Sequence, residues 1–247
     1  MLREERMDFI LNQLKSNPSV KLGALSEALK VSEFTVRRDI ESLDKSGLLK
    51  KVRGGAIPHS PMAHSFKERI HVSEKDKLTI AEKALSLITP GSTIILDGGT
   101  TTFALAGLLN MPVIVITNNI PAANLLASKR NMEVIIVGGR ILPESQVTAG
   151  THAIRMLEQF HVDLCFMGVC SLHHEIGVSS KDYFECEIKR AMVNCSDKIV
   201  ALTEHDKIGT AESFKICPIE TLDTIITEID PGNKIFAPYL KSDIQIL

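Results

Sequence analysis

The strongest chemical signal in the chain is a loop of glycines and threonines, Asp97-Gly98-Gly99-Thr100-Thr101-Thr102, between an apolar run and a helical segment that ends at Leu109. Glycines let the backbone approach a ligand closely, and the amides and hydroxyls supply hydrogen-bond donors. A helix N-terminus also favours an anion. The loop therefore predicts a phosphate site, with capping of the helix by the threonines as the alternative. Neither the P-loop pattern nor the dinucleotide-binding pattern is present.

Two further polar groups follow apolar or helical segments. Lys207 comes after another apolar run and is placed to supply a cation to the same anion. Glu185 and Lys189 stand four residues apart on one predicted helix, a spacing that also suits an ordinary surface salt bridge.

No metal site, other cofactor or disulfide framework is predicted. The five cysteines are odd in number and form no C-x-x-C pair, so buried reduced thiols are expected. His173, His174 and Asp182 have no spacing typical of a metal site, and we assign them no chemistry.

A second set of residues, near the N-terminus, favours DNA binding. Ser32 is a suitable N-cap for a helix whose apolar face carries Val36, Ile40 and Leu43. The opposite face of this helix offers polar side chains near its N-terminus, the end that reaches base edges in the major groove. These side chains are Glu33, Thr35, Arg37 and Arg38, and Ser32 at the cap is also expected to bind DNA. Arginine forms bidentate bonds to guanine, and threonine bonds a base or contacts a thymine methyl group.

A basic strand follows this helix and turns at Gly54-Gly55. Its cations, Lys50, Lys51 and Arg53, are spaced to lie along a phosphate backbone as the wing of a winged helix. The alternative is a solvated three-helix adaptor, because charged runs on helices are commonly exposed faces without a ligand.

The apolar periodicity of residues 1–47 predicts three short helices. The first ends before Asn17-Pro18, the second starts at about Lys21, and the third ends at Gly47. The second and third helices are separated by a tight turn, which is the pattern of a helix-turn-helix.

The remainder of the chain alternates apolar runs with helical segments. The runs are Thr93–Leu96, Val113–Ile116, Val134–Val137, Leu164–Met167 and Ile199–Leu202. This alternation predicts βα units around a mostly parallel sheet, and ligands of such sheets bind beyond the carboxyl ends of the strands. We expect the polar residues after the five runs to converge on one crevice.

The composition supports two domains. The 247 residues are 44% hydrophobic and carry a formal charge of −2, which by itself argues against nucleic-acid binding. However, residues 1–58 hold 11 Lys and Arg against 8 Asp and Glu, so a basic module precedes an acidic one. A Gly- and Pro-containing stretch sets the boundary near residue 60. No membrane span or signal-peptide core is visible, and we expect a cytoplasmic protein.

The N-terminal part resembles the DeoR-type winged helix-turn-helix. The resemblance rests on Arg3 and Arg6, on Val31-Ser32-Glu33-Phe34-Thr35-Val36-Arg37-Arg38-Asp39-Ile40, and on Leu43, Gly47 and Arg53-Gly54-Gly55-Ala56. It covers about residues 1–58 and implies a DNA-binding domain there, followed by a linker at 59–72.

The C-terminal part, residues 73–247, resembles the DeoR-type effector-sensing domain. The motifs are the loop at 97–102, Thr117-Asn118, Val137-Gly138-Gly139, Phe166–Val169, Gly177–Ser179, Glu185–Met192 and Leu202–Gly209. This domain is similar in fold to ribose-5-phosphate isomerase and glucosamine-6-phosphate deaminase. The implied fold class is α/β: a winged helix-turn-helix followed by a larger Rossmann-like domain.

The resemblance also implies a ligand, a phosphorylated sugar or related metabolite. Its phosphate is expected near Gly99–Thr102 and Lys207, and its polyol end near Asp97, Asn118, Gly139 and Glu185, with Gly138 beside them. The last motif departs from the usual Ala-Asp-Ser-Ser-Lys, because this chain has Thr203-Glu204-His205-Asp206-Lys207.

These features predict a transcriptional regulator, most consistent with a repressor of a carbohydrate-metabolism operon that binds double-stranded operator DNA. One small module offers few base contacts, so a homodimer or higher homo-oligomer is expected. The alternatives are an activator and a sugar-phosphate isomerase or deaminase. An enzyme could recruit Asp97, Glu185 and Glu204 as acids or bases but would leave the winged helix unexplained. We therefore predict no enzymatic activity.

Overall fold

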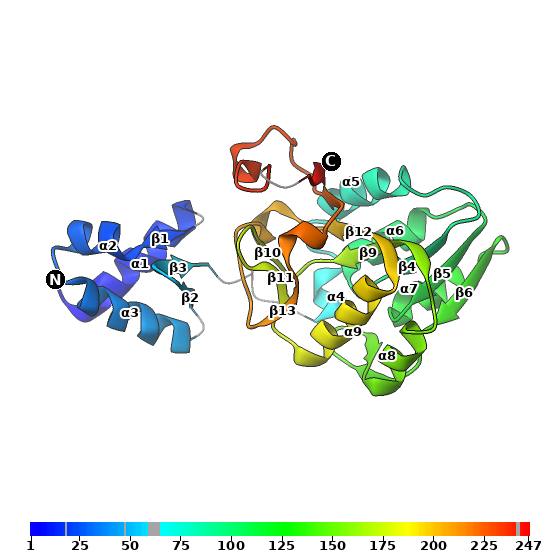
Figure 1. Ribbon diagram of the computed structural model, residues 1–247, viewed down its shortest axis with the longest axis horizontal. Coiled ribbons are helices and arrows are strands. Elements are labelled where there is room, and N and C mark those ends of the chain that lie inside the picture. The colour runs from blue at the N-terminus through cyan, green and yellow to red at the C-terminus, as the bar shows by residue number, and fades with distance from the viewer. Residues whose placement is uncertain (18, 47, 59–64, 241–242) are drawn as a thin grey trace.

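The computed structural model describes residues 1–17, 19–46, 48–58, 65–240 and 243–247. Figure 1 shows a small N-terminal module and a larger α/β domain. Within the described residues, no helix combines the length and apolar character needed to cross a lipid bilayer.

The N-terminal module consists of three helices and a small antiparallel sheet. The elements are α1 (Arg3–Ser16), β1 (Val20–Lys21), α2 (Leu22–Leu29), α3 (Glu33–Lys45), β2 (Lys50–Val52) and β3 (Gly55–Ile57). Strand β3 pairs with both β1 and β2. Ile10, Leu25 and Val36 meet in one core from the three helices. The helix-turn-helix and the wing are therefore both present, as the periodicity predicts.

The turn between α2 and α3 is set by local backbone chemistry. Lys30 has a left-handed conformation, with φ of 53°, and its amide bonds the end of α2. Ser32 then caps α3, because its side chain accepts a hydrogen bond from the amide of Thr35. Pro18 and Gly47, which were expected to follow the first and third helices, lie outside the described residues.

The segment expected to be a linker, 59–72, contains a helical turn. Residues 59–64 lie outside the described residues, and α4 (Phe66–Arg69) follows them. The Phe66 ring is buried and packs edge-to-face on Phe103, with ring centroids 5.9 Å apart. The end of this segment is therefore packed on the larger domain, where helix α5 (Glu74–Leu85) begins.

The larger domain is built on a seven-stranded sheet in the order β15-β14-β12-β9-β4-β5-β6. Its strands are β4 (Thr93–Leu96), β5 (Val113–Thr117), β6 (Met132–Ile136), β9 (Val162–Gly168), β12 (Ser196–Leu202), β14 (Thr224–Ile226) and β15 (Gln245–Ile246). Every neighbouring pair is parallel. The five predicted apolar runs form five of these strands, and the sequence analysis missed β14 and β15.

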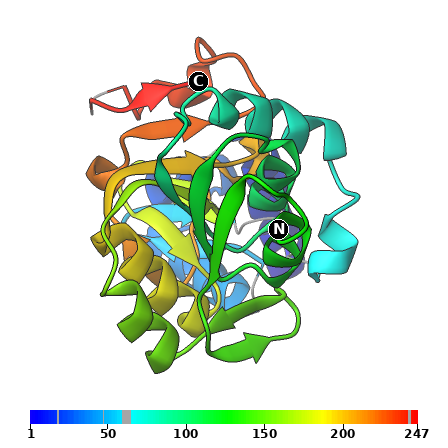
Figure 2. The same ribbon diagram turned by 90° about the vertical axis from the view of Figure 1, so that its right-hand side faces the viewer.

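Helices cover both faces of this sheet (Figure 2). They are α5, α6 (Thr100–Leu108) and α7 (Ile120–Leu126) on one face, and α8 (Thr151–Leu157) and α9 (Tyr183–Asn194) on the other. Successive residues of a strand point to opposite faces, so Ile94 and Leu96 belong to the first core and Ile95 to the second. Burial on both faces explains the continuous apolar runs of the strands.

Two small antiparallel sheets lie outside the main one. They consist of β7 (Arg140–Leu142) with β8 (Val147–Ala149), and of β10 (Ser171–His173), β11 (Gly177–Ser180) and β13 (Phe214–Cys217). Short 3-10 turns occupy His205–Lys207, Ile219–Thr221 and Lys234–Phe236.

The direction in which successive strands are added to the sheet reverses between β4 and β9. From β4 the chain adds β5 and β6 on one side, and then returns to place β9 against the other side of β4. Such a reversal leaves a crevice at the carboxyl ends of the two central strands, where ligands of open α/β sheets bind.

Candidate functional site

A cavity of about 150 Å³ lies beyond the carboxyl ends of β4 and β9, at the reversal of strand order. Its charged lining is balanced. The cations are Arg69, Lys181, Lys189 and Lys207, and the carboxylates are Asp97, Glu144, Asp182 and Glu185. A ligand in this cavity therefore meets separate positive and negative groups and no overall excess of either charge.

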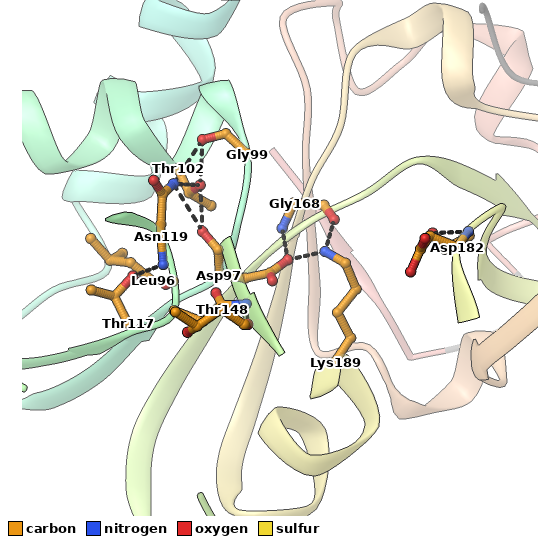
Figure 3. A network of polar contacts seen from close by, with 12 residues as sticks. Leu96, Asp97, Gly99, Thr102, Thr117, Asn119, Thr148, Gly168, Asp182 and Lys189 are labelled. Atoms are coloured by element: carbon orange, nitrogen blue, oxygen red, sulfur yellow. Dashed lines mark hydrogen bonds and ion pairs between the residues drawn. The ribbon is translucent and has the colours of Figure 1, made fainter. Parts of the chain in front are cut away.

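Thr102 and Asn119 shape the loop that follows β4 (Figure 3). The Thr102 hydroxyl donates to the carbonyl oxygens of Asp97 and Gly99, at 2.7 and 3.0 Å. The side-chain amide of Asn119 donates to the Gly99 carbonyl at 3.0 Å. These bonds use the carbonyl groups of the loop, so Thr102 acts as a support for the backbone and does not cap the helix.

The N-terminus of α6 opens onto this cavity without a side-chain cap. Its N-cap residue is Gly99, whose φ of 146° favours glycine, and no side chain accepts a hydrogen bond there. In contrast, Asn119 caps α7 and Asp182 caps α9. The first-turn amides and the dipole of α6 are thus available to an anion. The alternative in which the threonines cap this helix does not match the structure.

Asp97 and Lys189 form a buried ion pair at the base of the cavity (Figure 3). Lys189 Nζ also donates to the Gly168 carbonyl at 2.8 Å, and the Gly168 amide donates to the Asp97 carboxylate at 3.0 Å. Burial raises the pKa of the Asp97 carboxyl more than Lys189 lowers it. Burial lowers the pKa of Lys189, but Asp97, Cys170 and Glu185 together outweigh this effect and the pKa is raised. The pair joins the exits of β4 and β9 to α9.

This arrangement corrects the interpretation of Glu185 and Lys189 as a surface salt bridge. The Lys189 side chain is 4% exposed and its partner is Asp97, which is distant in sequence. Glu185 remains on the cavity wall.

Lys207 reaches the cavity but shares its charge with a neighbour. Its Nζ donates to Glu204 Oε1 at 2.8 Å, and Glu204 is buried. Asp206, the additional carboxylate of this motif, is exposed and is not among the cavity residues. Glu204 is therefore the hydrogen-bonded partner of Lys207 at the cavity.

Asn118 offers the cavity a hydrogen-bond acceptor. Its Nδ2 donates to the Thr148 carbonyl at 3.1 Å, while its Oδ1 is buried and has no partner among the described residues. Leaving a buried acceptor unsatisfied costs free energy, and a ligand hydroxyl would remove that cost. Asn118 thus offers an unsatisfied acceptor to a hydrogen-bond donor of a ligand.

Eight of the eleven residues predicted to bind an effector line this cavity. They are Asp97, Gly98, Gly99, Thr100, Thr101, Asn118, Glu185 and Lys207. The structure does not place Thr102, Gly138 or Gly139 there. Gly138 and Gly139 come directly after β6, the last strand on its side of the sheet, and neither lines the cavity. Gly139 instead packs against Ala149.

Several charged cavity residues were not predicted as site residues. They are Arg69, Glu144, Lys181, Asp182 and Lys189. Asp182 could have been found, because an aspartate three residues before Glu185 has the spacing of a helix N-cap. Arg69 and Glu144 carry no such local signal. Among the residues that the structure describes, no group of three or more His, Cys, Asp or Glu is arranged to hold a metal ion.

The predicted DNA-reading face of α3 is exposed. Glu33, Arg37 and Arg38 face solvent, while Val36 and Ile40 are buried against the other helices. This division places the polar residues on one side of the helix, as the sequence predicts.

Ser32 and Thr35 support each other at the start of α3. The Ser32 hydroxyl accepts a hydrogen bond from the Thr35 amide at 3.3 Å, and the two hydroxyls lie 3.0 Å apart. The Ser32 hydroxyl therefore has a structural role in this helix.

Asp39 is a carboxylate of α3 that is buried. Arg6 donates to its two oxygens at 2.7 and 3.3 Å, and Arg3 lies 3.5 Å from it. Asp39 in turn raises the pKa of Arg6. The two arginines neutralise Asp39 and tie α1 to α3.

The wing presents cations on its exposed side. Lys51 and Arg53 are exposed, and the chain turns at Gly54, where φ is 86°. Lys51 pairs with Glu41 of α3, which fixes the wing to the helix. Lys50 Nζ lies 3.5 Å from Ser213 Oγ of the larger domain.

A winged helix-turn-helix joined to an α/β domain with a polar cavity defines a DNA-binding regulator with a small-molecule sensor. The DeoR-like helix-turn-helix domain matches residues 6–61, and the DeoR C terminal sensor domain matches residues 72–229. The chain belongs to the DeoR family of transcriptional regulators.

Relatives that match nearly the whole chain are named as transcriptional regulators or repressors. The HTH-type transcriptional regulator GolR of Listeria innocua is 34% identical, over 98% of this chain and 97% of its own. The HTH-type transcriptional repressor GlcR of Bacillus subtilis is 31% identical, over 100% and 96%. The glycerol-3-phosphate regulon repressor of Escherichia coli is 28% identical, over 100% and 99%. These names identify regulators, so the chain is a regulator and not the isomerase or deaminase considered as an alternative.

Solved structures with similar arrangements are more distant. Ribose 5-phosphate isomerase A of Methanocaldococcus jannaschii is 17% identical over 54% of each chain, with a TM-score of 0.40.

Proposed function

We propose that this regulator represses a carbohydrate-metabolism operon and that a phosphorylated sugar or related metabolite controls its affinity for operator DNA. It would act in the cytoplasm, with access to DNA. The name of the E. coli relative, a glycerol-3-phosphate regulon repressor, supports a phosphorylated metabolite. The names GlcR and glycerol-3-phosphate regulon repressor both support repression.

One observation carries the ligand assignment. The uncapped N-terminus of α6, with Gly99 and the following threonines, opens onto a cavity that also contains Lys207. Backbone amides at a helix N-terminus bind phosphate without a dedicated side chain. The same cavity offers hydroxyl groups its carboxylates and the Asn118 oxygen, which has no partner among the described residues. These groups together suit a ligand that carries both a phosphate and hydroxyls.

Repression and release require two arrangements of the protein. A ligand shifts their populations only if it binds one arrangement more tightly than the other. In the proposed mechanism, the ligand-bound sensor domain favours an arrangement in which the recognition helices bind the operator weakly. A symmetric homodimer or larger homo-oligomer would read paired half-sites, because one α3 helix contacts only a few bases.

The proposal is tested by fluorescence anisotropy on DNA from upstream of the protein's own gene. The titration is repeated with glycerol 3-phosphate, ribose 5-phosphate, glucose 6-phosphate and galactosamine 6-phosphate, and with the matching unphosphorylated compounds as controls. At least one phosphorylated compound should weaken DNA binding, while its unphosphorylated partner should not.

Two results would contradict the proposal. Indifference of DNA binding to every phosphorylated compound argues against phosphate recognition in the cavity. Tighter DNA binding with the ligand argues for a co-repressor or activator mechanism and against release by the ligand.

The recognition surface is tested separately with two substitutions. Arg38→Ala should weaken binding to the cognate site by about 1–3 kcal/mol if Arg38 contacts a base, whereas Lys51→Ala should weaken binding to all DNA similarly. Equal effects of Arg38→Ala on cognate and random DNA would remove Arg38 from base recognition.

A further inference from the structure

Arg69 lines the sensor cavity although it precedes the domain that forms the rest of it. It is the last residue of α4, in the segment that connects the wing to the sensor domain. Strand β3 of the wing ends at Ile57 and α4 begins at Phe66, so only eight residues separate the two elements. A cavity residue therefore lies on the covalent connection to the DNA-binding module.

Helix α4 is attached to the walls of the same cavity. The Phe66 amide donates to the Glu144 carbonyl at 2.7 Å, and Glu144 lines the cavity. The Phe66 ring packs on Phe103, which follows the uncapped first turn of α6. The position of α4 is thus set by the loop before β8 and by the helix whose N-terminus faces the cavity.

A buried lysine completes the attachment. Lys77 of α5 is 4% exposed, and its Nζ donates to the carbonyl oxygens of Arg69 and Val72. Two carbonyls at the end of α4 are therefore satisfied by one cation from the sensor domain. These bonds fix the backbone of Arg69, whose residue lines the cavity.

The chemistry of Arg69 suits an anionic ligand. A guanidinium presents five donors in a planar fork and binds phosphate oxygens through two parallel hydrogen bonds. Lys189 and Lys207 also line the cavity, but an ammonium group is a point charge. Arg69 brings to the cavity a planar fork that those lysines do not offer.

We propose that Arg69 contacts the phosphate of the effector and that this contact couples the occupied cavity to the DNA-binding module through α4. The inference rests on the proposed function, because it assumes a phosphorylated ligand in this cavity. Ligand bound between the α6 N-terminus and Arg69 stabilises one position of α4, and α4 is joined covalently to the wing. Arg69 is then both a ligand contact and the reason that the two arrangements bind the ligand unequally.

The test uses the full chain and three substitutions in α4. Arg69→Gln removes the charge and the fork, Arg69→Lys keeps the charge, and Lys67→Ala removes an exposed cation of the same helix as the matched control. Calorimetric titration measures binding of the phosphorylated compound that acts on the wild type, and anisotropy measures operator affinity with and without it. Thermal melting monitored by circular dichroism confirms that each variant folds.

Arg69→Gln should weaken ligand binding at least tenfold and leave operator affinity without ligand within about twofold of the wild type. The ligand affinity of Arg69→Lys should fall between those of Arg69→Gln and the wild type. The ligand affinity of Lys67→Ala should match that of the wild type. A fourth variant, Phe66→Leu, should keep ligand affinity within about threefold but reduce the change in operator affinity at saturating ligand, because it loosens α4 on α6.

The outcomes separate this inference from the proposed function. Failure of all four phosphorylated compounds to bind the wild type overturns the proposed function and the inference together. Wild-type binding that Arg69→Gln leaves unchanged overturns only the inference, and so does a full operator response in Phe66→Leu.

Discussion

The Asp97–Lys189 ion pair is the residue-scale feature that joins most parts of the cavity. Both side chains are almost fully buried, at 1% and 4% exposed, so each charge depends on the other. Replacing one partner leaves an uncompensated charge in the protein interior, and this is more costly than replacing both.

Lys189→Met should therefore lower the free energy of unfolding of the sensor domain by about 3–5 kcal/mol. The double variant Asp97→Asn with Lys189→Met removes both charges and should recover a large part of the loss. Urea denaturation followed by circular dichroism measures both variants. A double variant as unstable as Lys189→Met alone would show that packing of the lysine stem, and not its charge, holds this region together.

The pair formed by His205 and Glu228 should make the free energy of unfolding depend on pH. The hydrogen bond to Glu228 raises the pKa of His205, burial opposes it, and Asp206 and Asp76 add to it. A raised pKa in the folded state means that the protonated form stabilises the fold. The stabilisation is complete below the ordinary histidine pKa of about 6.5 and is lost as the pH rises through the higher folded pKa.

His205→Gln should thus destabilise the protein more at about pH 5.5 than at about pH 8.5. The His205 side chain is 57% exposed, so solvent screens the pair and the difference should stay below about 1 kcal/mol. Urea denaturation of wild type and variant at both pH values provides the measurement. Equal destabilisation at the two values would mean that this pair does not titrate with folding.

At the residue scale, sequence reasoning succeeds where the signal is local. The loop at 97–102 combines glycine, hydroxyl groups and a helix start within six residues, and most of it lines the cavity. A surface pair with Glu185 was one interpretation of Lys189, because only this neighbour four residues away is visible in the sequence. Its actual partner, Asp97, lies on another strand, and such tertiary pairs leave no local pattern.

At the element scale, the two glycines after β6 provide a matched pair of substitutions. At Gly139, φ is 153° and an added Cβ would lie 2.6 Å from the Ala149 carbonyl oxygen. At Gly138 an added Cβ meets no atom within 4 Å. The two positions differ in backbone conformation and in available space, although both were predicted to bind the effector.

Gly139→Ala should therefore destabilise the sensor domain by about 1–3 kcal/mol, because β7 and β8 must shift. Gly138→Ala should change stability by less than about 1 kcal/mol. Neither should change the ligand affinity of the folded protein, since neither glycine lines the cavity. Thermal melting and calorimetric titration test both statements. Loss of ligand binding in a folded Gly138→Ala protein would indicate that Gly138 does contribute to the ligand site.

Elements were predictable in proportion to their length. The five predicted strands are central or long, and their apolar runs reflect helices on both faces of the sheet. Strand β15 has two residues and β14 has three, which is too short for a periodic signal. Helix α4 has four residues and is held by tertiary contacts, so composition suggested a linker there.

At the scale of the whole molecule, the uneven charge controls how DNA is bound. The N-terminal module carries the basic excess, and the structure places Arg38, Lys51 and Arg53 on its exposed surface. The larger domain carries more carboxylates than cations and offers phosphate backbones little attraction. DNA affinity should thus depend on few phosphate contacts in each copy of the chain, and on how many copies bind together.

The salt dependence of DNA binding measures how many copies of the chain contact DNA together. Each phosphate contact adds about −0.9 to the slope of log K against log salt concentration, so Arg53→Ala should reduce the slope by ~0.9 for each bound copy that loses one contact. A dimer on paired half-sites should therefore lose ~1.8, whereas Lys234→Ala, an exposed cation of the sensor domain, should leave the slope unchanged. Anisotropy titrations of the full chain over a range of salt concentrations measure the slopes. A loss of ~0.9 would indicate that only one wing contacts DNA at a time. In a symmetric dimer both subunits carry the substitution, so two wings on DNA would lose two contacts.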